Sequence, residues 1–251
     1  MKFDFATHFC KVCFKDIHAD NIPSLLGEDT HLCQSCFSKM HPKMMFYKLD
    51  GIPVISCYLY NEKIREMLYQ FKGCFDIELG EVFLVNQKRY FQYIFHSYYL
   101  VPAPSYKEKD EVRGFNHVEE LFKGIGKGYI HAIIKKDDIK QANLHFRKRQ
   151  EIATHLLWNE KESVSGKNIL FVDDLITTGA TAKACTKLLL EHGAKKVKIL
   201  SLARVKEFSN EKRIVPFHCL PFMVMVKSQR SFRRTLWLIS LKKYSISRKE
   251  N

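Results

Sequence analysis

The stretch ILFVDDLITTGAT, from Ile169 to Thr181, decides the fold. Residues 168–172 form an apolar, β-rich run that predicts a buried strand, residues 173–179 predict a turn, and residues 180–192 predict a helix. The run KVKILSLAR, residues 196–204, predicts the next strand. A strand, a helix and a strand within about 35 residues form a right-handed βαβ crossover, so the sequence predicts a largely parallel sheet.

The turn has the chemistry of a phosphate site. Thr177, Thr178 and Thr181 offer hydroxyls, and Gly179 allows a ligand to approach the backbone closely. Ala180 begins the helix, so unpaired N–H groups and the positive end of the helix dipole face the same point. Such a junction at the carboxyl edge of a parallel sheet is suited to bind a phosphate group.

Two adjacent acids, Asp173 and Asp174, precede the turn and lie nearer the sheet. Their carboxylates can accept hydrogen bonds from two vicinal hydroxyls, such as those of a ribose. The alternative is a structural turn in which the acids cap the helix. The order of strand, acid pair, hydroxyl loop and helix favours a sugar-phosphate site over that alternative.

The segment before this junction also predicts α/β elements. The charges of residues 106–113 alternate in sign, which predicts a solvated loop. Apolar periodicity predicts strands at residues 52–60, 98–105 and 131–136, and helices at residues 62–72, 81–95 and from Phe115 onward.

Four of the eight cysteines form two CxxC pairs separated by 19 residues. Two such pairs can complete a tetrahedral thiolate site for Zn²⁺, and with all four positions filled by protein the metal would be structural. Disulfide pairs are disfavoured in a reducing compartment, whereas an iron–sulfur cluster stays open. The predicted metal ligands are Cys10, Cys13, Cys33 and Cys36.

The net charge of +14 is concentrated toward the C-terminal end. Residues 205–251 hold 11 Lys or Arg against 3 Asp or Glu, which favours a polyanionic partner such as nucleic acid or an anionic membrane surface. Within this tail, cations alternate with Phe232, Trp237 and Tyr244. Contact with single-stranded DNA, docking of an amphipathic helix, and no function remain three open interpretations. We expect an intracellular protein, because we find neither a signal peptide nor an apolar run that could span a bilayer.

Several segments together resemble a known family. The stretch from Ile169 to Thr181 resembles the signature with which type I phosphoribosyltransferases bind phosphoribosyl pyrophosphate (PRPP), and VPAPS (residues 101–105) resembles their pyrophosphate loop. RGFN (residues 113–116) and QANLHFRKRQ (residues 141–150) are further markers. Preceded by the paired CxxC module, this order resembles the competence protein F (ComF or ComFC) family.

The resemblance implies an α/β fold, a type I phosphoribosyltransferase-like parallel sheet flanked by helices, with a small N-terminal zinc module. It divides the chain into a four-cysteine module (1–48), a PRPP-binding domain (49–204) and a basic extension (205–251). It implies PRPP bound with Mg²⁺. The ribose would lie on Asp173 and Asp174, and the 5′-phosphate on Thr177, Thr178, Gly179, Ala180 and Thr181, with Ala103 and Arg113 at the pyrophosphate.

The resemblance also implies a function in natural transformation, namely the cytoplasmic handling of incoming single-stranded DNA. A DNA-translocase helicase would be a partner, and the protein would contact the surface of the inner membrane. Two alternatives stay open. One is a phosphoribosyltransferase of nucleobase salvage, and the other is a binding module whose loop recognises a terminal DNA phosphate or a regulatory nucleotide. The sequence leaves open whether the domain catalyses transfer.

Overall fold

We describe a computed structural model, in which the described residues are 9–17, 31–135, 156–205 and 213–216. The chain divides into two compact units, Met1–Ile214 and Val215–Asn251, and the account below concerns the first. The marker at residues 141–150 and nearly all of the basic extension lie outside the described residues. Among the described helices, none combines the length and apolar character needed to cross a membrane.

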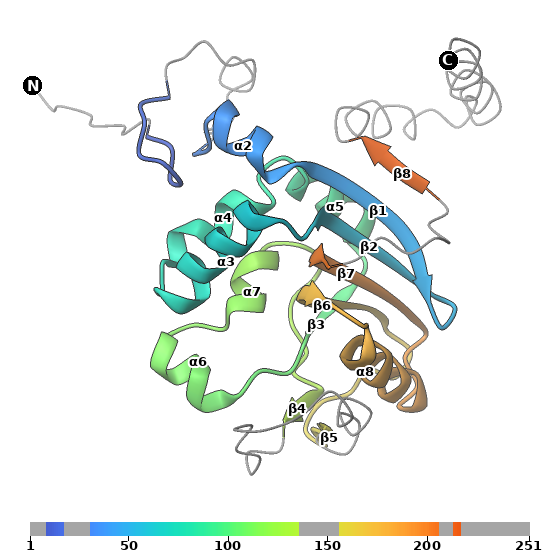
Figure 1. Ribbon diagram of the computed structural model, residues 1–251. Helices are drawn as coiled ribbons and strands as arrows, with labels where there is room; N and C mark the ends of the chain where they lie inside the picture. Colours follow the sequence, from blue (N-terminus) through green and yellow to red (C-terminus); the bar gives the residue numbers. More distant parts are fainter. Residues whose placement is uncertain (1–8, 18–30, 136–155, 206–212, 217–251) are drawn as a thin grey trace, which may run out of the picture. The chain divides into compact units, whose positions relative to one another are not determined.

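A six-stranded sheet forms the centre of the first unit (Figure 1), in the order β3-β6-β7-β2-β1-β8. Its four neighbouring strands β3, β6, β7 and β2 are parallel, whereas β1 pairs with β2 antiparallel. The sheet confirms the predicted α/β class. The strands are β1 (Pro42–Leu49), β2 (Ile52–Leu59), β3 (Tyr99–Pro102), β6 (Asn168–Ile176), β7 (Lys196–Arg204) and β8 (Arg213–Pro216), and a separate antiparallel pair comprises β4 (Ile133–Lys135) and β5 (Leu156–Trp158).

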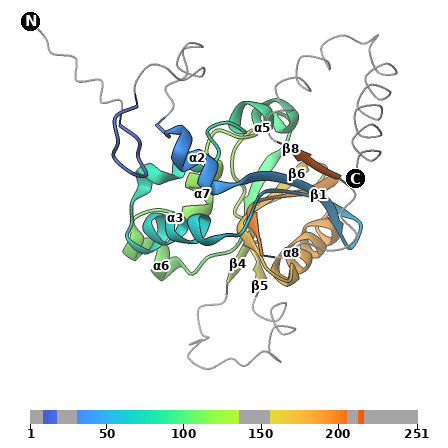
Figure 2. The ribbon, with the colours of Figure 1, turned by 45° about the horizontal axis from the view of Figure 1, so that its top comes forward.

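Helices cover both faces of this sheet. Figures 1 and 2 show α8 on one face, with α3, α4 and α7 on the other. Both α7 and α8 contact β6, the strand that carries the acid pair. The helices are α2 (Gln34–Met40), α3 (Glu62–Gly73), α4 (Gly80–Phe83), α5 (Lys88–Phe95), α6 (Lys107–Arg113), α7 (His117–Phe122) and α8 (Ala180–Glu191), with a 3₁₀ turn, η1, at Ile77–Leu79.

Burial on both faces explains why β6 is so apolar. Ile169 and Phe171 are fully buried and share a core with Cys185 and Leu189 of α8. The alternate residue Leu170 is equally buried on the opposite face. A parallel strand covered on both sides needs a nearly continuous apolar sequence, and this is the pattern that predicted it.

Three predicted elements are wrong in their extent or type. The strand β6 continues to Ile176, so the acids lie within a strand and not in a turn. The predicted loop at residues 106–113 is largely the helix α6, in which Arg113 pairs with Asp110 one turn earlier. The predicted helix over residues 81–95 is interrupted between α4 and α5.

The strand β1 is absent from the elements that the sequence predicts. It buries Met44 and Met45 completely and pairs with β2 through the turn at Asp50 and Gly51. The sequence places residues 42–48 in the N-terminal module, whereas the structure shows them in the central sheet.

The turn between β6 and α8 requires glycine. Gly179 has a φ of +76°, a left-handed conformation that residues with a Cβ avoid. A Cβ built there would lie 2.9 Å from Leu49 Cδ1, at the end of β1. The loop is therefore held close against the end of β1 at Gly179, while Thr177 and Thr178 are exposed.

Candidate functional site

The candidate site lies at the carboxyl end of β6, where the acid pair leads into the threonine–glycine loop. Asp173 and Asp174 are neighbours in the last part of this strand, and their side chains interact with each other. Asp174 meets α3 and α7: its Oδ2 lies 2.6 Å from Lys72 Nζ and 3.6 Å from His117 Nε2.

Asp173 has further neighbours. Its Oδ1 accepts a hydrogen bond of 2.9 Å from the backbone N–H of Asp174. Its charge also interacts with Lys135 of β4 and Cys185 of α8. The two acids therefore share Lys72 and Lys135 as neighbouring charges, and the short ion pair with Lys72 is made by Asp174.

The two acids have opposite tendencies to ionise. Burial raises the pKa of Asp173 well above its usual value, and the charge of Asp174 raises it further. Burial would also raise the pKa of Asp174, but the contacts with His117 and Lys72 outweigh it and hold this pKa below its usual value. The site therefore contains one carboxylate beside an acid that favours its neutral form.

The loop after β6 is short and leads directly into α8. Thr177 and Thr178 are exposed, and Thr178 Oγ1 accepts a hydrogen bond of 3.4 Å from Ala180 N–H. The N-cap of α8 is Gly179, which offers no capping oxygen. The positive end of this 12-residue helix is thus presented toward the loop hydroxyls, an arrangement suited to an anion.

The loop after β3 lies beside the same end of β6. The backbone N–H of Ala103 donates to the carbonyl of Val172 at 2.8 Å, which fixes the start of the loop against β6. Further along, Ser105 Oγ donates to Asp110 of α6. Asn116 Nδ2 donates to the same carboxylate at 3.0 Å and caps α7 with its own side-chain oxygen.

Arg113 organises the partners of Asp174. Its Nε donates to the backbone carbonyl of Lys72 at 3.0 Å, and its Nη1 to Asp110 Oδ1 at 3.0 Å. Nη1 also lies 3.1 Å from His117 Nδ1. Because a guanidinium only donates, His117 Nδ1 accepts, and the ring N–H at Nε2 faces Asp174. Arg113 acts here as a positioning residue, and its expected contact with pyrophosphate stays a prediction.

Sequence reasoning missed Lys72 and His117. Lys72 pairs with an acid 102 positions away, and no local pattern indicates such a contact. His117 follows the RGFN marker directly, four positions after Arg113, so the marker could have been extended to include it. Both residues become visible only when α3 and α7 pack on the sheet.

The four predicted cysteines come together into a compact cluster. The Sγ atoms of Cys10, Cys13, Cys33 and Cys36 all lie within 4.8 Å of one another, with 3.7 Å between those of Cys13 and Cys33. Cys33 Sγ also accepts a hydrogen bond of 3.4 Å from the backbone N–H of Cys36. Four thiol ligands at this spacing fit a structural Zn²⁺ ion.

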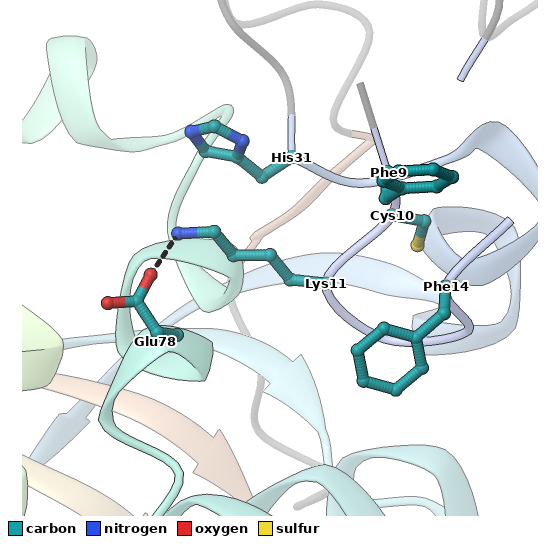
Figure 3. A pocket seen from close by; sticks show the side chains of 6 residues that line it. All are labelled: Phe9, Cys10, Lys11, Phe14, His31 and Glu78. Atoms are coloured by element: carbon teal, nitrogen blue, oxygen red, sulfur yellow. Dashed lines mark hydrogen bonds and ion pairs between the residues drawn. The ribbon is translucent and has the colours of Figure 1, made fainter. Parts of the chain in front are cut away.

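A lysine of the cysteine module forms ion pairs with the neighbouring helices. Lys11 Nζ lies 2.6 Å from Glu78 Oε2 of η1 and 3.2 Å from Glu81 Oε2 of α4. Figure 3 shows Lys11 extending to Glu78, with Phe9 and Phe14 on the loop that carries Cys10. His31 completes the lining of the shallow pocket around this contact.

The chain is similar to several known proteins. The family model of the phosphoribosyl transferase domain matches residues 118–226. Competence protein ComFC from Bacillus subtilis is 33% identical over 55% of this chain and 58% of its own length, so the chain spans less than two thirds of that relative. ComFC from Streptococcus pneumoniae is 32% identical over 61% of this chain and 69% of its own length. The crystal structure of a hypoxanthine-guanine phosphoribosyltransferase from Bacillus anthracis covers 55% of this chain and 77% of its own, at 14% identity and a TM-score of 0.33.

The parallel sheet, the loop that joins β6 to α8 and the family match define a protein of the phosphoribosyltransferase-like class. The two curated relatives narrow this class, because both are competence proteins and one is matched over more than two thirds of its length. The chain belongs to the ComFC family.

The opposite pKa shifts of the two acids predict opposite effects of amide substitution. Because the pKa of Asp173 is raised, its favourable contribution to folding stability is present at acid pH and is lost as pH rises. Asp173→Asn should therefore raise the melting temperature near neutral pH. Because the pKa of Asp174 is lowered, its contribution to folding stability is present at neutral pH and is lost in acid. Asp174→Asn should therefore lower the melting temperature near neutral pH. Each kcal/mol corresponds to roughly 2–4 °C in a chain of this size.

Thermal melts from about pH 4 to pH 8 measure both effects. The increase caused by Asp173→Asn should shrink toward the acid end, whereas the decrease caused by Asp174→Asn should persist, because a lowered pKa loses its contribution only below the ordinary value. Asp50→Asn is the control, since it breaks only an exposed ion pair of 2.9 Å with Lys183. Equal shifts for the two site variants at every pH would contradict the assignment of their ionisation.

The cysteine cluster predicts one zinc ion per chain. Cys33→Ser should abolish the bound metal and lower the melting temperature, because the small module has little core of its own. Cys74→Ser, an exposed cysteine outside the cluster, should retain the ion. Elemental analysis of the purified protein measures both, and iron in place of zinc would show that the metal is misassigned.

Proposed function

We propose that this protein binds PRPP and handles incoming single-stranded DNA in the cytoplasm during natural transformation. The observation that supports the PRPP site best is the junction at which the acids of β6 lead into the open loop and the N-terminus of α8. The competence function is supported by the relatives, both of which are competence proteins.

In this proposal PRPP lies along the carboxyl end of the sheet. Its 5′-phosphate binds the loop from Thr177 to Thr181, where backbone N–H groups and hydroxyls meet the helix dipole. Its ribose hydroxyls donate to Asp173 and Asp174. Its pyrophosphate points toward the loop at Ala103, beside β6. Mg²⁺ bound with PRPP would neutralise part of the pyrophosphate charge.

A second candidate is a phosphoribosyltransferase of nucleobase salvage, favoured by the match to the phosphoribosyl transferase domain. Transfer would break the bond between ribose C1 and the pyrophosphate oxygen, and a nitrogen of the acceptor would form the new bond. The carboxylate of Asp174 would favour the positive charge that develops on the ribose. Release of pyrophosphate with a panel of nucleobases separates this candidate from a protein that only binds PRPP.

DNA contact is proposed from charge. The chain carries a net charge of +14, and the extension at residues 205–251 combines cations with aromatic side chains, which can neutralise phosphates and stack on unpaired bases. The family further suggests a translocase helicase as partner and a position at the cytoplasmic surface of the inner membrane.

The organisation that we propose keeps three parts: a zinc module at residues 1–48, a PRPP-binding domain at 49–204 and the basic extension at 205–251. The residues from Pro42 onward would contribute β1 to the PRPP-binding domain.

Calorimetric titration with PRPP and Mg²⁺ tests the ligand. The unaltered protein should bind, and the double variant Asp173→Ala, Asp174→Ala should lose binding because both acceptors for the ribose hydroxyls are gone. The matched control is Glu62→Ala with Glu191→Ala, two exposed acids whose ion pairs lie within their own helices. Failure of the unaltered protein to bind PRPP would refute the proposed ligand.

Anisotropy of a labelled single strand at several salt concentrations tests the DNA contact. Affinity should fall steeply between about 50 and 200 mM salt, and replacing Arg233 and Arg234 with Gln should reduce the slope by roughly 1.4 if both contact phosphates. Lys187→Gln, on the exposed surface of α8, should leave the slope unchanged. A response that does not depend on salt would argue against phosphate contact.

A further inference from the structure

Asp174 already has a cationic partner in this structure. Lys72 Nζ lies 2.6 Å from its Oδ2, and the side chain of Asp174 is only 11% exposed. A ribose hydroxyl that approaches this carboxylate meets a strong charge-assisted hydrogen bond. Binding of a sugar phosphate must therefore rearrange or share the contact between Lys72 and Asp174.

The backbone of Lys72 is held by its helix and by Arg113, whereas its side chain can rotate to a new partner. The residue lies in the last turn of α3, and its carbonyl accepts a hydrogen bond of 3.0 Å from Arg113 Nε. Its side chain is 38% exposed, on a flexible four-carbon stem. Arg113, in contrast, has a side chain only 10% exposed that is bound to Asp110 and lies against His117. Of these two cations, Lys72 is the one that can move without dismantling the scaffold.

Lys72 and the phosphate loop approach the ribose position from different sides. The loop at Thr177–Thr181 leads into α8, whereas Lys72 belongs to α3, which lies on the other face of the sheet (Figure 1). Lys72 Nζ lies 2.6 Å from Asp174 Oδ2. A ligand whose 5′-phosphate lies on the loop and whose ribose hydroxyls reach Asp174 therefore comes within reach of Lys72.

We propose that Lys72 neutralises Asp174 in the empty site and moves its ammonium group to the pyrophosphate of PRPP when the ribose hydroxyls bind Asp174. This inference rests on the proposed function, because it assigns a residue to one end of the proposed ligand. Asp174 does not become an isolated buried charge during the exchange, since His117 Nε2 remains 3.6 Å from the same oxygen. Arg113 holds His117 in the tautomer that donates there.

The exchange makes Lys72 a determinant of ligand choice. A ligand that carries pyrophosphate offers the ammonium group a new anion in place of Asp174. Ribose 5-phosphate can make the same contacts with the loop and the acids, but it has no pyrophosphate for Lys72 to bind. The protein should therefore prefer PRPP over ribose 5-phosphate, and the preference should depend on the charge at position 72.

Titration of Lys72→Met with PRPP and with ribose 5-phosphate, each with Mg²⁺, tests the inference. PRPP affinity should fall about 10- to 100-fold, as expected for the loss of a hydrogen bond between charged groups. Affinity for ribose 5-phosphate should stay the same or rise, because its hydroxyls no longer compete with Lys72. Lys72→Arg should retain most of the preference for PRPP.

The matched control is Lys63→Met, which removes a lysine of the same helix whose partner is Glu66 at 3.3 Å, and both affinities should be unchanged. Thermal melts confirm that each variant is folded. The inference is overturned if Lys72→Met weakens both ligands equally or neither, or if the unaltered protein does not prefer PRPP. Absence of binding of either ligand to the unaltered protein would instead overturn the proposed function, and this inference with it.

Discussion

Two neighbouring carboxylic acids at the end of β6, Asp174 buried and Asp173 partly buried, are the constraint on which the rest of the site depends. Both cannot remain ionised without compensation, because each charge is removed from water and repels the other. The structure supplies Asp174 with Lys72 and His117, while Asp173 favours its neutral form. The helices α3 and α7 carry these two partners of Asp174 and are themselves held by buried apolar residues.

Arg113 connects these elements into one unit. A single guanidinium contacts the end of α3, the acid Asp110 of its own helix and the ring of His117. Its planar group suits three directed contacts, whereas a lysine would supply one point charge. The marker RGFN therefore has an architectural explanation: Arg113 orients the groups around Asp174, Gly114 ends α6 at a φ of +82°, and Asn116 caps α7.

The sequence predicted those parts of the fold and site that depend on neighbouring residues. The βαβ unit, the loop at Thr177–Thr181 and the four cysteines are local patterns, and the structure contains each of them. It did not predict β1, whose methionines are buried in the sheet that β1 forms with β2. It also did not predict that β6 extends through the acids. Lys72 was missed for the same reason, because its ion-pair partner Asp174 lies 102 positions away in the sequence.

The cysteine module contacts η1 and α4, which pack against α3 and α7 of this site. Lys11 contacts Glu78 and Glu81, and α4 packs against α7 so closely that a Cβ at Gly80 would lie 3.2 Å from Glu120. The helix α7 in turn carries His117 to Asp174. The contacts of Lys11 therefore connect the cysteine module, through α4 and α7, to the histidine that faces Asp174.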